Sequence, residues 1–324
     1  MSNLQNFLKF RTLNNEGIIE YPVLTNAAGE GSKTIEQIKR IISYNPCRAA
    51  VVGSITLEKR EGNPEPNFYY FENLKSAINS VGLKNPGLNY YKKNLPKLLS
   101  EFPKSLLILS IAYAPLQNDY KGDEKKELNK NPSLQFKILC EELIKINSKR
   151  ILTEINLSCP NVKEELLYED LNLTREILEV VEKESGEKKY TIKIGYMLPK
   201  HLNQFVSLIS SYNPLGIVAI NSMLGRFTDE GGRSYISEEY GGVSGKIIQP
   251  YARFMIYNLR RKLDEEGRRD IKIIACGGIF DVKDILNYKR DGADYFQIGT
   301  RFMVNESNKD LFSSLLIKLF EVSE

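Results

Sequence analysis

Ile151-Leu-Thr-Glu-Ile-Asn-Leu-Ser-Cys-Pro-Asn161 is the stretch from which both the fold and the site can be inferred. Its first part, Ile151 to Leu157, is short, apolar and β-branched, which is typical of a buried parallel strand. It ends in a thiol, a proline and two amides. Cys159 can take or give a proton, and Asn156 and Asn161 each offer two donors and an acceptor to a planar, heteroatom-rich ligand. Taken alone, the same residues also suit an inert thiol beside turn-forming amides.

Similar strand-like runs alternate with helical patterns along the chain, which is the signature of a parallel α/β fold. Eight runs are present, at residues 21–25, 49–52, 106–111, 151–157, 191–194, 216–220, 271–275 and 295–298. Helical patterns lie near residues 34–42, 133–148, 169–184, 200–212, 247–265, 281–290 and 311–320. Eight strand–helix units predict a single-domain (β/α)8 TIM barrel over residues 1–324, with an open doubly wound sheet as the alternative.

The segment from about residue 56 to 104 interrupts this alternation. It carries Pro64, Pro66, Pro86 and Pro96 and the aromatic cluster Phe68-Tyr-Tyr-Phe71. Functional loops of a barrel gather at the carboxyl ends of its strands. We therefore expect an insertion after the second strand that covers the C-terminal mouth of the barrel.

The composition restricts the function. The 45 basic and 41 acidic residues give a net charge of only +4 with no basic stripe, which argues against a nucleic-acid partner. The four cysteines are far apart and form no C-x-x-C pair, which indicates a reduced compartment and no bound metal. No apolar run approaches the ~20 residues of a membrane helix, and the N-terminus lacks a signal peptide's apolar core. A cytoplasmic protein without membrane contact is expected.

The predicted strand ends describe one pocket, because a barrel collects its reactive groups there. They carry small or polar residues, namely Ala28-Gly29, Gly53-Ser54, Asn156, Lys193, Asn221-Ser222, Cys276-Gly-Gly278 and Gly299-Thr300. Lys193 stands alone in an apolar strand, so we expect it to face an anionic or electron-rich partner, with an exposed strand lysine as the alternative.

Glycines after the last two strands predict a phosphate site, because backbone N–H groups converge at that end of a barrel. Gly277 and Gly278 follow the seventh strand and Gly299 follows the eighth. The segment Gly241-Gly-Val-Ser-Gly245 adds a third flexible backbone. Together these residues indicate a phosphorylated, planar cofactor with a thiol opposite its ring.

Several of these segments resemble the dihydroorotate dehydrogenases, the FMN-dependent barrels of pyrimidine biosynthesis. The matching segments, in the family's order, are Asn26-Ala-Ala-Gly29, Leu57-Glu-Lys-Arg-Glu-Gly-Asn-Pro64, Asn79-Ser-Val-Gly-Leu83, Glu154-Ile-Asn-Leu-Ser-Cys-Pro-Asn161, Asn221-Ser222, Cys276-Gly-Gly278 and Gln297-Ile-Gly-Thr300. The second segment and the cysteine at the base position resemble the soluble, fumarate-linked branch.

The resemblance implies a role for each matching residue. Cys159 would act as the base that takes a proton from dihydroorotate while a hydride passes to flavin N5, giving orotate. Substrate contacts would come from Asn79, Gly82, Leu83, Asn156, Asn161, Asn221 and Ser222. FMN contacts would come from Ala28, Gly29, Ser54, Asn156, Lys193, Asn221, Gly245, Gly277, Gly278, Gly299 and Thr300. A soluble electron acceptor and a homodimer are implied by the same branch.

Two departures concern the substrate. The family has a lysine where this chain has Gly53, and a basic residue where it has Asn67. Either another cation, such as Lys59, Arg60 or Arg226, replaces the missing lysine, or the protein works slowly or on a substrate without orotate's carboxylate. A lysine introduced at residue 53 is expected to tighten orotate binding if the variant folds. Alternatives are a related flavin enzyme with a different small substrate or reduced activity, a flavin-binding protein without catalysis, and a phosphate-binding barrel without flavin.

Overall fold

The computed structural model describes residues 9–14, 17–117, 119–147, 149–158, 167–187, 189–305 and 309–323, with side chains between residues 21 and 321. Eight parallel strands form its central sheet. They are β3 (Leu24–Asn26), β4 (Ala49–Ile55), β7 (Leu106–Ile111), β8 (Ile151–Asn156), β9 (Tyr190–Ile194), β10 (Gly216–Ala219), β13 (Lys272–Cys276) and β14 (Tyr295–Ile298). Each of the eight predicted runs therefore overlaps one strand of this sheet, although Tyr21 and Pro22 of the first run end a strand of the N-terminal hairpin instead.

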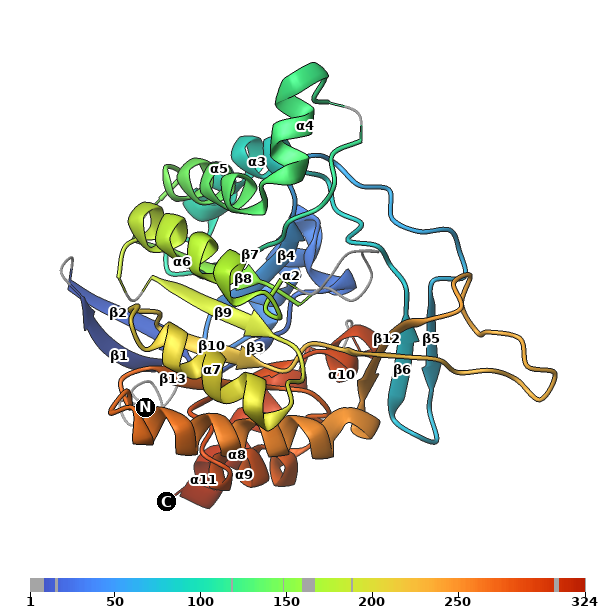
Figure 1. Ribbon diagram of the computed structural model, residues 1–324. Coiled ribbons are helices and arrows are strands. Elements are labelled where there is room, and N and C mark those ends of the chain that lie inside the picture. The colour runs from blue at the N-terminus through green and yellow to red at the C-terminus, as the bar shows by residue number, and fades with distance from the viewer. Residues whose placement is uncertain are drawn as a thin grey trace.

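The sheet curls into a barrel with helices around it (Figure 1). The strand order is β3-β14-β13-β10-β9-β8-β7-β4. The surrounding helices are α2 (Ile35–Tyr44), α3 (Leu88–Glu101), α5 (Pro132–Ile144), α6 (Leu171–Ser185), α7 (Pro199–Ile209), α8 (Gln249–Glu265), α9 (Val282–Arg290) and α11 (Leu311–Ser323). The predicted (β/α)8 architecture is thus confirmed, and the open doubly wound sheet is wrong.

Side-chain amides close the barrel between β3 and β4, the two ends of the strand order. Asn26 Nδ2 donates to Val51 O at 2.7 Å, and Asn26 Oδ1 accepts from Val51 N at 3.0 Å. Asn45 Nδ2 donates to the carbonyls of Leu24 and Ala49, each at 3.1 Å. Both asparagines are buried. They satisfy backbone groups that would otherwise pair in an eighth ladder, between β3 and β4.

The barrel interior is apolar at one end and polar at the other. Its apolar layer contains Val51, Ile108, Leu152, Val218 and Ile274. Glu154, Asn156 and Lys193 continue the inward-facing positions of β8 and β9 toward the carboxyl ends, because side chains alternate along a strand. The polar end is therefore built into the sequence of the strands themselves.

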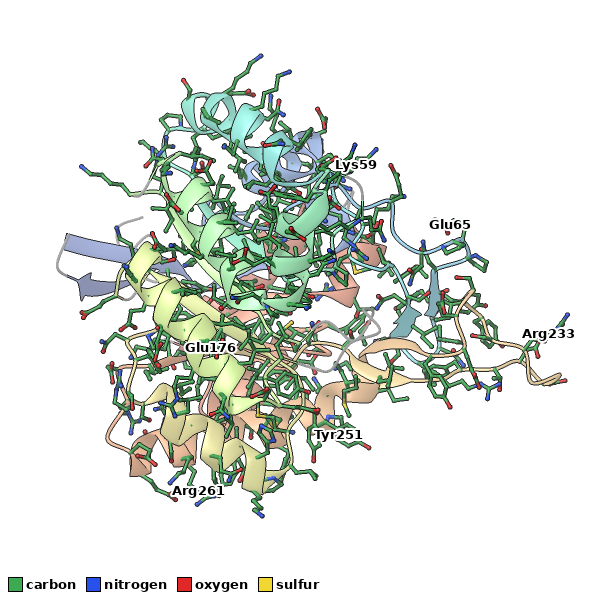
Figure 2. All side chains as sticks on the ribbon, turned by 45° about the horizontal axis from the view of Figure 1, so that its top comes forward. Lys59, Glu65, Glu176, Arg233, Tyr251 and Arg261 are labelled. Atoms are coloured by element: carbon green, nitrogen blue, oxygen red, sulfur yellow. The ribbon has the colours of Figure 1, made fainter. Side chains whose placement is uncertain are left out.

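A second, four-stranded antiparallel sheet stands at the mouth of the barrel. Its order is β11 (Met223–Gly225), β12 (Gly241–Gly245), β6 (Ser76–Asn79) and β5 (Phe68–Phe71). Figure 1 shows it on the side toward which the barrel strands point, and Figure 2 places Arg233 near the tip of the loop between β11 and β12. The expected cover after the second strand is therefore present, and it pairs with an insertion after β10.

The bounds of the predicted insertion need two corrections. Residues 88–101 are not part of it, because they form α3, the regular helix of the second unit, which buries Leu88, Leu95 and Leu98 despite Pro96. The segment Gly241–Gly245 is the strand β12 rather than a flexible loop. Sequence periodicity also missed α4 (Gly122–Lys130), α10 (Thr300–Val304) and the hairpin of β1 (Lys9–Asn14) and β2 (Gly17–Pro22).

Candidate active site

A cavity at the C-terminal mouth brings together residues from seven of the eight barrel strands or the loops after them. The volume of the cavity is about 990 Å³, including the part that is open to solvent. The predicted residues that line it are Ala28, Gly29, Ser54, Asn79, Leu83, Asn156, Lys193, Asn221, Ser222, Gly245, Gly277, Gly278, Gly299 and Thr300. Gly82 lies beside the cavity without lining it, and Cys159 and Asn161 fall outside the described residues.

A buried ion pair forms the floor of the cavity. Lys193 Nζ lies 4.0 Å from Glu154 Oε1, and the two side chains are 3% and 0% exposed. Gln297 Nε2 donates to Glu154 Oε2 at 2.8 Å, whereas Glu154 Oε1 has no hydrogen-bond partner among the described residues. Lys193 is therefore buried beside one carboxylate and still faces the cavity, as the sequence predicted. The alternative of an exposed lysine is wrong.

The amides above this floor are held in place by one another. Asn156 Nδ2 donates to Ser54 Oγ at 2.9 Å, and Ser54 Oγ lies 3.1 Å from Ser110 Oγ. Asn221 Nδ2 donates to Ser158 O at 2.7 Å. Such contacts fix the orientation of each amide and leave its remaining polar atoms available to a flat ligand with N–H and C=O edges. The chain leading into Cys159 is tied to this network at Ser158.

The insertion after β4 supplies another wall of the cavity, which contains Asn79 and Leu83. Asn79 Nδ2 donates to Gly242 O at 2.9 Å, so β6 and β12 hold the asparagine between them. Leu83 has a positive φ of 57°, after Gly82 at 70°. This left-handed turn is fastened from outside, because Arg60 Nε donates to Gly82 O at 3.2 Å. The turn therefore presents Leu83 to the cavity.

The glycines after β13 form a close-fitting backbone cradle. Gly277 and Gly278 have φ values of 128° and 67°, which disfavour any side chain. A Cβ on Gly278 would lie 2.8 Å from both Gln249 Cβ and Gly245 O. Tyr288 OH donates to Gly277 O from α9, and Thr300 Oγ1 donates to Ser244 Oγ at 2.9 Å. Backbone N–H groups gathered at such a cradle suit a phosphate group.

Three cationic side chains line the cavity in the described part of the chain, and sequence reasoning identified only Lys193. Lys33 forms an ion pair with Glu30. Arg301 directly follows Thr300, and its Nη1 is buried without a hydrogen-bond partner among the described residues. Its position next to a predicted phosphate-binding residue was the signal that could have found it.

The cations expected to replace a lysine at residue 53 do not line the cavity. Lys59 pairs with Glu61, Arg60 donates to Gly82 O and Pro115 O, and Arg226 pairs with Glu239. Their side chains are engaged in the insertion or at its surface. Of the two alternatives, replacement of the missing lysine by one of these cations is wrong for the described structure, and the alternative of slow turnover or a substrate without a carboxylate stays a prediction.

Gly53 cannot simply be exchanged for lysine. Its φ is 117°, and a Cβ there would lie 2.5 Å from Ser110 O and 2.7 Å from Ile55 N. Both neighbours are backbone atoms of the barrel, so they cannot move aside as a flexible side chain would. The expectation that a lysine at residue 53 would tighten orotate binding is therefore replaced by the expectation of a strained barrel.

Fold and cavity define the chain as a (β/α)8 barrel whose mouth combines a phosphate-type glycine cradle with amides and a buried lysine. The family model for dihydroorotate dehydrogenase matches residues 19–313. The chain therefore belongs to the dihydroorotate dehydrogenase family, a family of flavin-dependent oxidoreductases. None of the described helices is both long and apolar enough to span a bilayer.

Individual relatives agree with this assignment. A probable dihydroorotate dehydrogenase A (fumarate) from Enterococcus faecalis is 28% identical over 93% of this chain and 89% of its own length. The dihydroorotate dehydrogenase (fumarate) of Saccharomyces cerevisiae is 30% identical over 85% of this chain and 82% of its own. The NAD(+)-linked catalytic subunit from Bacteroides fragilis is 26% identical over 86% and 83%. The crystal structure of DHODH from Eimeria tenella in complex with ferulenol superposes on this chain with a TM-score of 0.76 at 17% sequence identity. The match covers 97% of this chain and 84% of the Eimeria tenella chain, and it supports the fold.

Proposed function

We propose that this chain oxidises dihydroorotate to orotate with FMN as its cofactor, in pyrimidine biosynthesis. One observation carries the proposal. The same cavity is lined by the glycine cradle and by three oriented amides, those of Asn79, Asn156 and Asn221. When bound, FMN would accept a hydride from the substrate. The remaining chemistry falls to the side chains of the chain.

Each group has a task that its surroundings permit. Gly277, Gly278, Gly299 and Thr300 would hold the phosphate through backbone N–H groups and a hydroxyl. Lys193 would place its positive charge beside the reduced ring system, in a site shielded from water where charges interact more strongly than in bulk. Ala28, Gly29, Ser54 and Gly245 would complete the cofactor contacts.

The substrate would be held edge to edge by amides. Asn79, Asn156, Asn161, Asn221 and Ser222 supply donors and acceptors that suit the N–H and C=O groups of a pyrimidine ring. Gly82 and Leu83 would flank it. Cys159 would remove the proton, and it follows Ser158, whose carbonyl is bound by the cavity residue Asn221.

Cys159→Ala tests this assignment. The variant should keep its flavin and lose on the order of a hundredfold in the rate of flavin reduction, the size typical of a positioned base. The wild-type rate should rise with pH as thiolate forms, since a free thiol has a pKa near ~8.5. An unchanged rate in the alanine variant would remove Cys159 from the mechanism.

The proposals for the electron acceptor, the cellular location and the oligomeric state rest on similarity to other proteins. The relatives from Enterococcus faecalis and Saccharomyces cerevisiae are named for fumarate, which supports a soluble acceptor such as fumarate. A cytoplasmic location and a homodimer are proposed by analogy with the soluble branch that the sequence resembles. Turnover with fumarate compared with NAD+ tests the acceptor, because the Bacteroides fragilis relative is named for NAD(+). Sedimentation at working concentration tests the dimer.

One observation favours a second candidate, the oxidation of a related small substrate without a carboxylate. Among the described residues, the substrate wall consists of neutral groups, namely Ser54, Asn79, Val81, Leu83, Asn156, Asn221 and Ser222. A carboxylate bound there would rely on hydrogen bonds rather than on an ion pair. Comparing dihydroorotate with dihydrouracil as reductants of the flavin distinguishes the two substrates.

A further inference from the structure

Arg301 is a cavity residue that neither the resemblance nor the glycine pattern assigns. It is the second residue of α10 and directly follows Thr300 at the end of β14. It lines the cavity together with Gly277, Gly278 and Gly299, the glycines that follow the last two strands. Arg301 is therefore part of the cavity wall beside Thr300 and the glycines that follow the last two strands.

The guanidinium group is not satisfied by the protein around it. Arg301 Nη1 is buried and has no hydrogen-bond partner among the described residues. Burial lowers the pKa of Arg301, although the nearby carboxylates of Asp281 and Asp284 act in the opposite direction. A buried donor without an acceptor costs free energy, and more so when it carries charge. An anionic acceptor in the cavity would remove that cost.

The two nearby carboxylates already serve other groups. Asp284 accepts from Lys246 and Gln249, and from the backbone amides of Phe280 and Asp281. Asp281 caps α9 by accepting from Asp284 N at 3.0 Å. No ion pair between either carboxylate and Arg301 is present in the described structure. Neither carboxylate therefore satisfies the guanidinium group of Arg301 through an ion pair among the described residues.

Lys33 makes a useful contrast within the same cavity. Its ammonium group pairs with Glu30, which also lines the cavity, so the two charges offset each other. Arg301 has no such paired acid among the described residues. An incoming phosphate dianion would thus gain more from Arg301 than from Lys33.

We propose that Arg301 binds the phosphate of the flavin through a charge-assisted hydrogen bond and makes this chain select FMN over riboflavin. The inference rests on the proposed function, because it takes FMN as the cofactor. A guanidinium group donates in a planar fork that matches phosphate oxygens, and it supplies the charge that neutral backbone amides lack. Riboflavin has the same ring and no phosphate, so it would gain nothing from this contact.

Flavin titrations of the reversibly deflavinated full chain test the proposal. Quenching of flavin fluorescence gives the dissociation constants for FMN and riboflavin in the wild type, in Arg301→Gln and in Arg301→Lys. We expect Arg301→Gln to weaken FMN binding about ten- to hundredfold, as for loss of a hydrogen bond between charged groups, and to leave riboflavin binding unchanged. Arg301→Lys should recover part of the FMN affinity, and the salt dependence of FMN binding should fall in Arg301→Gln.

The controls separate the possible failures. Arg290→Gln removes an exposed arginine at the end of α9 and should alter neither constant. Equal weakening of FMN and riboflavin in Arg301→Gln would show a structural role and overturn the proposal, as would unchanged FMN binding. If Arg301→Gln does not fold, the test uses Arg301→Lys instead. An FMN-to-riboflavin affinity ratio in Arg301→Lys equal to that of the wild type would then refute the proposal. Wild-type protein that binds neither flavin would instead refute the proposed function.

Discussion

The buried pair of Lys193 and Glu154 allows stability and catalysis to be separated. Lys193→Met removes the ammonium group and leaves Glu154 in the barrel interior with Gln297 as its remaining described hydrogen-bond donor. Two unit charges 4.0 Å apart interact by about 4 kcal/mol at an effective dielectric constant of 20. Breaking a buried pair by removing one partner typically costs about 3–5 kcal/mol. We expect Lys193→Met to lose that much free energy of unfolding.

A second substitution should restore the stability and leave the catalytic loss. Glu154→Gln in the Lys193→Met background removes the unpaired charge, and the new amide can still contact Gln297. The double variant should therefore be more stable than Lys193→Met, with a coupling energy of about 1–3 kcal/mol between the two sites. Its flavin should still be reduced slowly, because the positive charge beside the ring is absent in both variants.

Urea unfolding of deflavinated protein measures the stability term, since bound flavin would add its own contribution. The four members of the cycle are the wild type, Lys193→Met, Glu154→Gln and the double variant. Free energies that add within ~0.5 kcal/mol would refute the reasoning, because independent sites add and coupled sites do not. Recovery of the wild-type reduction rate in the double variant would refute the catalytic role of Lys193.

Three further predictions concern the frame of the cavity. Asn26→Ala should cost about 2–4 kcal/mol in urea unfolding, because Val51 N–H and C=O lose their partners. The half-buried Asn258 loses only a solvent-accessible hydrogen bond to Phe254 O of its own helix, so Asn258→Ala should cost under ~0.5 kcal/mol. Gly53→Ala should lower the free energy of unfolding by about 2 kcal/mol or more. Gly232 also has a positive φ but has open space around it, so Gly232→Ala should lower it by only about 1 kcal/mol. Equal losses in the two variants would show that the contact with Ser110 O is unimportant. Burial would raise the pKa of Asp284, yet hydrogen bonds from Lys246, Gln249 and two backbone amides outweigh it and lower that pKa. The Asp284 carboxylate therefore stabilises the fold above its unfolded pKa of ~4, and this stabilisation is lost as the pH falls through the lower folded pKa. Asp284→Asn should cost about 1–3 kcal/mol at pH 7, and its difference from the wild type should shrink toward pH 3 in pH-dependent unfolding.

Much of the fold was predictable because strand and helix periods are local properties of the sequence. The runs at 106–111 and 295–298 coincide with β7 and β14 because they are apolar segments bounded by polar turns. The sheet at the mouth was not predictable in this way. Its strand β12 reads Gly-Gly-Val-Ser-Gly and pairs with Ser76–Asn79, more than 160 residues away along the chain, so only tertiary contacts define it.

Some residues of the site could likewise be predicted from the sequence, whereas others depend on tertiary contacts. Lys193 and the glycines could be predicted because a strand end is a fixed place in a barrel, and they do line the cavity. The surroundings of Gly53 could not, because the obstacle there is Ser110 O, a backbone atom of the neighbouring strand. Arg301 was missed for a similar reason: whether a guanidinium group is buried and unpaired depends on packing of α9 and α10 that no local pattern shows.

Anaerobic mixing of dihydroorotate with the flavin-loaded protein tests the central claim most directly. The bound flavin should bleach within a single turnover, dihydrouracil should bleach it more slowly, and Cys159→Ala should react with dihydroorotate about a hundredfold more slowly than the wild type. Dithionite serves as the control that the flavin can be reduced at all. Protein whose flavin bleaches with dithionite and stays oxidised with dihydroorotate would contradict the account.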